Sequence, residues 1–366
     1  MKIAILTSSR ADYSIYLPLL KVLKSDPFFE LQIIAFGTHL SVKFGETVNQ
    51  ITDDGFDITF KVDSLPDSDS PSDISVAMGK TFTNFSSVWK DHQFDLVIAL
   101  GDRYEMFAAC TSSIPFGVKI AHIHGGETTK GAIDDIFRNS LSLMSTYHFT
   151  TTDKYKSRVI ELLGEDNNVF NVGALSVDNL SSLKLLSILE IKEKFGIDLS
   201  MPSILITFHP ETVEFEKNRE YIGELISALK EISDYQFVIT MPNADTMGNM
   251  VRQELSYFIS GCSHAYGIES FGTLGYLSSM KHCSMMLGNT SSGFVEAAFF
   301  NKYVINIGER QRGRILTKNI RSCDIKKDEI ITAVNDFEHI VLVEGVNVYG
   351  DGKAAQKITS LIKQLL

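Results

Sequence analysis

Cysteine is scarce in this chain of 366 residues, and so is positive charge. The four cysteines are scattered and form no CxxC pair: Cys110, Cys262, Cys283 and Cys323. This usage argues against a disulfide framework and a zinc site and favours a reducing compartment, so we expect a cytoplasmic protein. The net charge of −11 argues against a non-specific nucleic-acid binder, which normally carries a basic face.

Long hydrophobic runs are also lacking. No stretch approaches the roughly 20 apolar residues of a membrane span, and the opening MKIAILTSSR has too short an apolar run for a signal-peptide core. We therefore expect no membrane association. The hydrophobic fraction of 44% and the charged fraction of 22% are typical of soluble globular proteins, and the length favours two domains.

Apolar runs of strand length alternate with longer segments of helical period, which predicts an α/β fold built on parallel sheets. The predicted strands are Ile3–Leu6, Leu31–Phe36, Asp95–Leu100, Val118–Ile123, Tyr147–Thr150, Val169–Val172, Ser203–Thr207, Gln236–Met241, Cys283–Leu287 and Tyr303–Ile307. The predicted helices include Ser14–Leu23, Ile74–Trp89, Tyr104–Ser113, Ile133–Met144 and Lys353–Leu366. Since the pattern weakens after residue 175, we expect Rossmann-like domains over residues 1–175 and 176–352, with a ligand cleft between them.

Polar, charged and glycine residues follow almost every predicted strand, at the sheet edge where such folds bind ligands. GNTSSGFVE (288–296) follows a strand and is expected to open a helix, so backbone N–H groups near Ser291 and Ser292 suit a diphosphate. Glu296 is placed to accept from ribose hydroxyls. The competing interpretation is a plain helix start with a Ser or Thr cap.

Arginines supply the cationic groups that a phosphate needs. Arg10 follows the first strand, and Arg310, Arg312 and Arg314 crowd one loop, for which a solvated basic loop is the alternative. Arg103 stands beside Asp102 in LGDR, where the carboxylate is either a catalytic group or a loop anchor.

HIHGGE offers His124 and Glu127 around two glycines, whereas His122 lies within the strand and is expected to be a buried, satisfied imidazole. Asp134 and Asp135 lie in the first turn of the next predicted helix, where an acid is often only a dipole partner. His209 precedes a proline at a strand end and is a candidate for proton transfer or phosphate contact. Further residues at such strand ends that we expect to hold the substrate are Asn243, Asp245 and Asn289.

Taken together, these motifs make the chain resemble the hydrolysing UDP-N-acetylglucosamine 2-epimerases of sialic acid and related nonulosonate synthesis. The resemblance covers nearly the full length and rests on SRADYS (9–14), GDR (101–103), HIHGGE with GAIDD (131–135), HP (209–210), PN.D (242–245), GN.SSG (288–293) and YGDG (349–352). It implies the B-type glycosyltransferase fold, a carboxy-terminal helix that crosses back onto the first domain, a homodimer, and no metal or NAD.

The resemblance also implies a reaction in two halves. The nucleoside diphosphate is eliminated to leave a 2-acetamidoglucal, and water then adds to give free N-acetylmannosamine and UDP. By motif, Asp102 matches a catalytic aspartate, Asp134 an acidic active-site residue, and His209 a histidine near the diphosphate. His124 stands where some well-known members carry a glutamate, and Glu127 is a possible substitute for it.

Three alternatives stay open. The same chemistry serves a UDP-linked diacetamido-trideoxy sugar or a GDP-linked sugar, as in legionaminic acid routes. A true glycosyltransferase of the same fold would need an acceptor site, and a non-catalytic nucleotide-sugar sensor would bind UDP without turnover.

Overall fold

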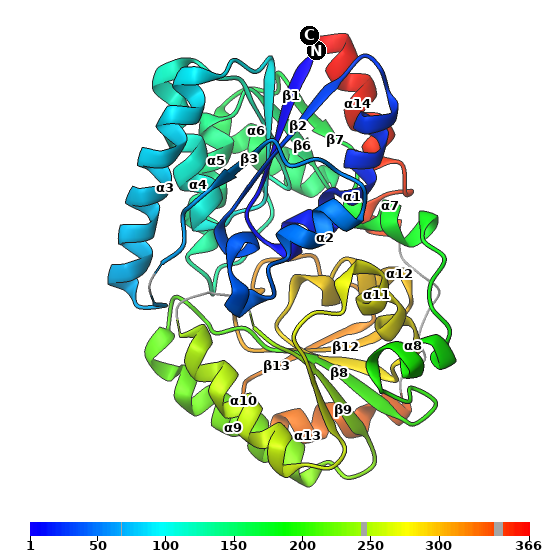
Figure 1. Ribbon diagram of the computed structural model, residues 1–366. Helices are drawn as coiled ribbons and strands as arrows, with labels where there is room; N and C mark the ends of the chain where they lie inside the picture. The colour runs from blue at the N-terminus through cyan, green and yellow to red at the C-terminus, as the bar shows by residue number, and fades with distance from the viewer. Residues whose placement is uncertain (67, 243–246, 340–346) are drawn as a thin grey trace. The chain divides into compact units, whose positions relative to one another are not determined.

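The computed structural model of the chain describes residues 1–366 except 67, 243–246 and 340–346 (Figure 1). The chain divides into two compact units. Unit 1 comprises Met1–Glu127, Asp134–Ser181 and Val348–Leu366, and unit 2 comprises Thr128–Ile133 and Ser182–Asn347. A short segment after Glu127 belongs to unit 2, and the end of the chain belongs to unit 1.

Unit 1 is built on a seven-stranded sheet of order β3-β2-β1-β4-β5-β6-β7, in which every neighbouring pair is parallel. The strands are β1 (Lys2–Thr7), β2 (Glu30–Phe36), β3 (Phe60–Val62), β4 (Leu96–Leu100), β5 (Ile120–Ile123), β6 (Tyr147–Thr150) and β7 (Val169–Asn171). The central β4 and β5 are buried along their whole length, as expected of parallel strands covered by helices on both faces.

The helices of unit 1 bury apolar stripes against this sheet. They are α1 (Arg10–Ser25), α2 (Val48–Asp53), α3 (Pro71–Asp91), α4 (Tyr104–Ser113), α5 (Asp134–Met144), α6 (Asp153–Leu163), α7 (Leu175–Ser182, whose last residue falls in unit 2) and α14 (Ala354–Leu365), with short 3-10 turns at 37–40, 42–44 and 114–116. The last helix, red in Figure 1, packs against α1, and Ile358 and Ile362 join the core around β1. Asp178 caps it by accepting from the backbone N–H groups of Ala354 and Ala355 at 2.9 and 2.8 Å.

Unit 2 contains a six-stranded parallel sheet of order β10-β9-β8-β11-β12-β13. Its strands are β8 (Ser203–Thr207), β9 (Gln236–Thr240), β10 (Ala265–Ile268), β11 (Met285–Gly288), β12 (Tyr303–Ile307) and β13 (Ile320–Cys323). Its helices are α8 (Ile188–Phe195), α9 (Asn218–Glu231), α10 (Gly248–Gly261), α11 (Gly272–His282), α12 (Glu296–Phe299) and α13 (Lys327–Asn335), with 3-10 turns at 215–217, 291–293 and 336–339 and one more at 347–349, largely in unit 1.

The predicted α/β class with two parallel sheets is confirmed, and every predicted strand is present with small shifts at its ends. The sequence did not predict β3, β10 and β13, which are short strands at sheet edges. None of the helices in the described part of the chain combines the length and the apolar character that crossing a membrane requires.

Candidate active site

In unit 1, Asp102 follows β4 and is paired with a buried arginine. Gly101 has φ of +81°, a conformation that glycine adopts without strain, and the chain turns there to present Asp102. The Arg138 Nη2 donates to Asp102 Oδ2 from the middle of α5. Only 3% of the Arg138 side chain is exposed, and within the described residues its Nε and Nη1 have no hydrogen-bond partner. Sequence reasoning missed Arg138, which places a fixed positive charge beside Asp102.

His122 holds the backbone in front of Asp102. Its Nε2 lies 2.8 Å from the Gly101 carbonyl oxygen, and its Nδ1 lies 3.1 Å from Ser142 Oγ. A carbonyl only accepts, so Nε2 carries the proton and Nδ1 accepts from the serine. Complete burial lowers the pKa of His122 to about 3, and this outweighs the opposing effect of the Gly101 carbonyl. His122 is therefore a neutral, satisfied imidazole that anchors the loop.

His124 and Glu127 lie together after β5. The His124 Nδ1 is 3.4 Å from Glu127 Oε1, and the Thr151 hydroxyl donates to the same oxygen at 3.0 Å. Both predicted residues are largely buried, with His124 8% and Glu127 2% exposed. His124 adopts φ of +69°, an uncommon conformation for a residue with a side chain. The turn thus holds an imidazole and a carboxylate in one polar contact, which suits proton transfer.

Gly126 explains how tightly this turn is packed. A Cβ on Gly126 would lie 2.3 Å from the carbonyl oxygen of Tyr155, which is main chain and moves little. The glycines of HIHGGE therefore allow the loop to pass against α6, as the motif predicted from their lack of a side chain.

Arg103 is a predicted substrate contact, and Asp134 is predicted to be either an active-site acid or only a helix-dipole partner. The Arg103 guanidinium forms a two-pronged ion pair with the buried Glu105, at 3.1 and 3.0 Å. Asp134 is the first residue of α5, where a carboxylate also stabilises the helix dipole.

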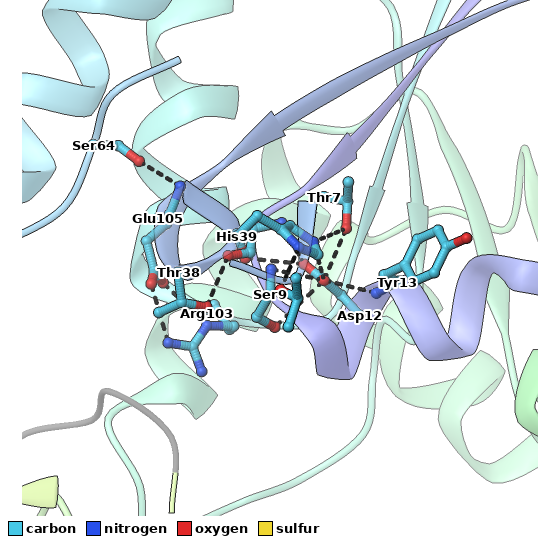
Figure 2. Close-up of polar contacts among 12 residues, drawn as sticks. Thr7, Ser9, Asp12, Tyr13, Thr38, His39, Ser64, Arg103 and Glu105 are labelled. Carbon is cyan, nitrogen blue, oxygen red and sulfur yellow. Dashed lines mark hydrogen bonds and ion pairs between the residues drawn. The ribbon is translucent and has the colours of Figure 1, made fainter. Parts of the chain in front are cut away.

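A buried polar network, missed by the sequence reasoning, lies at the turn between β1 and α1 (Figure 2). Arg10 begins α1, two residues before Asp12. Asp12 accepts from the backbone N–H groups of Ser8 and Ser9, at 2.7 and 2.9 Å, and from the Thr7 hydroxyl at 2.9 Å. The carboxylate therefore fixes the turn between β1 and α1.

His39 completes this network and is fully buried. Its Nε2 lies 2.9 Å from Thr7 Oγ1, and its Nδ1 lies 2.8 Å from Thr47 Oγ1. Because Thr7 already donates to Asp12, its oxygen accepts from His39 Nε2, and Nδ1 accepts from Thr47. Burial lowers the pKa of His39, with the charge of Asp12 opposing the effect.

In unit 2, His209 is held by Asn289 across two neighbouring strand ends. The Asn289 side-chain oxygen accepts from the His209 N–H at 2.7 Å, and its amide donates to the His209 carbonyl at 2.8 Å. Asn289 is 0% exposed, and both of these bonds fix the backbone that presents the imidazole. Asn289, which the sequence predicts to hold the substrate, has its side-chain amide hydrogen-bonded to the His209 backbone.

The arginine-rich loop after β12 is joined to the same cluster through Glu211. Glu211 Oε1 accepts from the backbone N–H groups of Glu309 and Arg310, at 2.7 and 3.2 Å. Burial raises the pKa of Glu211, against the lowering effect of these two N–H groups. Arg310 Nη1 donates to the Asn289 carbonyl at 3.2 Å, and its buried Nε has no hydrogen-bond partner within the described residues.

Gln311 and Arg314 extend this arrangement. The Gln311 amide donates to the Asn289 carbonyl at 2.8 Å, and the Arg314 Nε donates to Gln311 Oε1 at 2.6 Å. Arg314 is 7% exposed, whereas Arg312 pairs with Glu309 on the surface. Arg314 is therefore buried and Arg310 is partly buried with an enclosed Nε, which the solvated alternative does not explain.

GNTSSGFVE folds differently from the expected helix start. Ser291, Ser292 and Gly293 form one 3-10 turn capped by Thr290, and α12, which begins at Glu296, has only four residues. A short helix supplies little dipole, so the groups that this loop offers to an anion are its N–H and hydroxyl groups. The Ser292 hydroxyl contacts the Tyr276 hydroxyl at 2.6 Å.

Two predicted residues, Asn243 and Asp245, lie outside the described residues. Within the described part of the chain, no group of three or more His, Cys, Asp or Glu side chains is arranged to hold a metal ion.

Comparison with known proteins gives consistent matches. The model of the UDP-N-acetylglucosamine 2-epimerase family matches residues 21–363. The chain is 35% identical to a GDP/UDP-N,N'-diacetylbacillosamine 2-epimerase (hydrolyzing) of Campylobacter jejuni, over 88% of this chain and 84% of that protein. It is 33% identical to the polysialic acid biosynthesis protein P7 of Escherichia coli, over 100% and 94% of the two chains. Its fold is similar to that of UDP-GlcNAc 2-epimerase from Neisseria meningitidis, solved bound to UDP-GlcNAc, with a TM-score of 0.83, 18% identity and full coverage of both chains.

Proposed function

The chain belongs to the UDP-N-acetylglucosamine 2-epimerase family, and we propose that it is a hydrolysing member that converts UDP-N-acetylglucosamine to N-acetylmannosamine and UDP. The proposal includes a homodimer that works in the cytoplasm, in a route to sialic acid or a related nonulosonate. It needs no metal and no nicotinamide cofactor.

The observation that carries the proposal is the cluster of strand-end loops in unit 2. Hydrogen bonds join His209, Asn289 and Arg310 there. Within the described residues, the buried Nε–H of Arg310 donates to no acceptor. A buried N–H donor needs an acceptor, and a pyrophosphate oxygen is the strong, charge-assisted one that this family's substrates carry. Ser291, Ser292 and Arg314 belong to the same proposed diphosphate site, with Glu296 toward the ribose.

Leaving-group stabilisation decides the rate of the first half-reaction. The hydrogen on C2 is not adjacent to a carbonyl, so it becomes acidic only as the C1–O bond breaks and C1 gains positive character. Donors fixed in advance at the diphosphate stabilise the departing charge. The C2–H electrons then form the C1–C2 double bond, UDP leaves, and a base takes the proton.

The acids and bases of unit 1 serve the C2 proton and the water. Asp102, which forms an ion pair with Arg138, is the proposed base for C2, and the His124–Glu127 pair and Asp134 are proposed for the return step. In that step water adds its oxygen to C1 and a proton to C2, which completes N-acetylmannosamine. Arg10 and Arg103 are proposed substrate contacts of unit 1, and Asn243 and Asp245 of unit 2.

A second candidate substrate is supported by one of the matches. The Campylobacter jejuni relative is named for a GDP- or UDP-linked diacetylbacillosamine, so the same chemistry on a diacetamido-trideoxy sugar is favoured by that relationship. The elimination concerns only C1 and C2, and the two substrates differ away from those atoms.

A panel of nucleotide sugars tests both candidates. UDP-N-acetylglucosamine, UDP-N,N'-diacetylbacillosamine and the GDP-linked counterpart are incubated separately, and release of the nucleoside diphosphate is followed by chromatography. The proposed function predicts the highest kcat/KM for UDP-N-acetylglucosamine, and the second candidate predicts it for a diacetamido sugar. Transfer of the sugar to an added acceptor, with Asp102→Asn still active, would replace both with a glycosyltransferase.

A further inference from the structure

Six residues between the proposed catalytic acids of unit 1 belong to unit 2. This strap, Thr128–Ile133, leaves unit 1 directly after Glu127 and re-enters it at Asp134. Its contacts in unit 2 are with the two loops that form the proposed diphosphate site. The Lys130 N–H donates to the Arg312 carbonyl at 3.2 Å, and the Ile133 N–H donates to the Thr212 hydroxyl at 2.9 Å.

Gly131 makes the closest approach of the strap. A Cβ built on Gly131 would lie 2.5 Å from the carbonyl carbon and oxygen of Glu309 and 2.6 Å from the Arg310 Cα. These are main-chain atoms of a loop that Glu211 already holds, so they cannot give way cheaply. A side chain at this position would push the strap and the loop apart by about 1 Å, if ordinary carbon contacts of 3.5 Å or more are to be restored.

The opposite end of the strap is fixed by the loop after β8. Thr212 follows Glu211 within HPET, so the residue that accepts from Ile133 is adjacent to the residue that holds Arg310. Gly313 also packs against the strap, because a Cβ there would lie 2.7 Å from Thr128 Oγ1. The strap therefore contacts, from its first residue to its last, the two loops that contain His209 and Arg310.

We propose that this strap transmits the position of the diphosphate-binding loop to Glu127 and Asp134, and that Gly131 and Thr212 are positioning residues for the reaction. The inference rests on the proposed function. A diphosphate drawn onto Arg310 orders the loop 308–314, the loop fixes the strap, and the strap sets the two acids that follow and precede it in the chain. Departure of UDP releases the acids by the same route.

Gly131→Ala tests the link through its steric effect. A displacement of about 1 Å at a catalytic group lowers turnover about 100-fold. We expect that fall in kcat, with the Kd for UDP, measured by calorimetry, changed less than about threefold because Arg310 and Ser292 remain. Gly223→Ala is the matched control: it makes the same change in α9 of unit 2, where a Cβ meets nothing within 4 Å, and kcat should be unchanged.

Thr212→Val tests the link without adding bulk, and it carries the test if Gly131→Ala does not fold. Loss of the acceptor for the Ile133 N–H should lower kcat about five- to tenfold, which corresponds to one hydrogen bond. Thr212→Ser keeps the hydroxyl and should restore the wild-type rate. Lys130→Ala, which keeps the strap backbone and removes an exposed side chain, should have no effect.

Amide hydrogen exchange gives a readout that does not depend on turnover. UDP should slow exchange of the 128–133 peptide in the wild-type protein, and Thr212→Val should reduce this slowing at Ile133 while loop 308–314 is still protected. The inference is wrong if UDP leaves the strap amides unchanged, or if UDP affinity and kcat fall together in Gly131→Ala. A wild-type protein that protects the strap with UDP but turns over no nucleotide sugar would refute the proposed function and leave the link intact.

Discussion

Glu211→Ala removes the anchor of the arginine loop, and its effect follows from two hydrogen bonds. The carboxylate oxygen Oε1 accepts from the backbone N–H groups of Glu309 and Arg310, and the side chain is buried to 98%. A buried donor that loses its acceptor destabilises a protein by about 1–3 kcal/mol. Because water can reach the space that the shorter side chain leaves, we expect a total loss of about 2–4 kcal/mol in the free energy of unfolding of unit 2.

The same change should weaken nucleotide binding. Without Glu211 the loop no longer holds Arg310 beside Asn289, and a charge-assisted hydrogen bond to a phosphate contributes about 1.5–3 kcal/mol. We therefore expect the Kd for UDP to rise by about one to two orders of magnitude. Urea titration followed by circular dichroism measures the first effect, and isothermal titration calorimetry measures the second.

Glu211→Gln is the control, because both N–H groups point to one oxygen that glutamine retains. Burial raises the pKa of Glu211, so the folded protein binds this proton more tightly than the unfolded chain does. The wild-type protein therefore loses stability as the pH rises through the folded-state pKa, and the uncharged glutamine should gain on it over that interval. An alanine variant with wild-type stability and UDP affinity would refute the role of Glu211 as anchor.

Three further predictions concern residues placed by the structure. Asp102→Asn should lower turnover about 10²- to 10⁴-fold and leave UDP affinity largely unchanged. Ser292→Ala should raise the Kd for UDP about fivefold with a smaller effect on kcat. UDP-release assays measure turnover and calorimetry measures affinity, and finding the two effects exchanged would contradict both assignments. The pKa of His122 is about 3 in the folded protein and 6.5 in the unfolded chain, so between these pH values only the unfolded chain binds a proton at this imidazole. The contribution of His122 should therefore lower the free energy of unfolding by about 1.4 kcal/mol for each pH unit as the pH falls from 6.5 toward 4. His122→Gln keeps a donor for the Gly101 carbonyl and should flatten this slope in urea titrations at several pH values; an unchanged slope would show that His122 is not responsible.

Much of the fold could be predicted because its signals are local. β4 and β8 are short apolar runs bounded by polar loops. Because parallel strands end at the same edge of a sheet, the residues that follow them, Asp102 and His209, could be assigned to that edge from the sequence. The edge strands β3 and β13 were missed because a charged residue interrupts each of them (FKV and IRSC), and β10 was missed because it has four residues with a glycine among them (AYGI).

The partners of the predicted residues could not be predicted because they are distant in the sequence. Arg138 pairs with Asp102 across 36 positions, and Glu211 holds the Arg310 loop across 99. The strap could not be predicted either, because its partners are also distant in the sequence and nothing in TTKGAI (128–133) indicates that this segment belongs to unit 2. Asn289 was correctly placed in a motif at a strand end, but only the structure shows that its amide serves His209.

Proton NMR in deuterated water tests the central claim most directly, because it follows the anomeric bond and the C2 position in one experiment. With UDP-N-acetylglucosamine we predict that UDP and free N-acetylmannosamine appear in equal amounts, and that the sugar carries deuterium at C2. A product still attached to UDP would contradict the hydrolytic step, and a free sugar that retains its C2 hydrogen would contradict elimination and water addition.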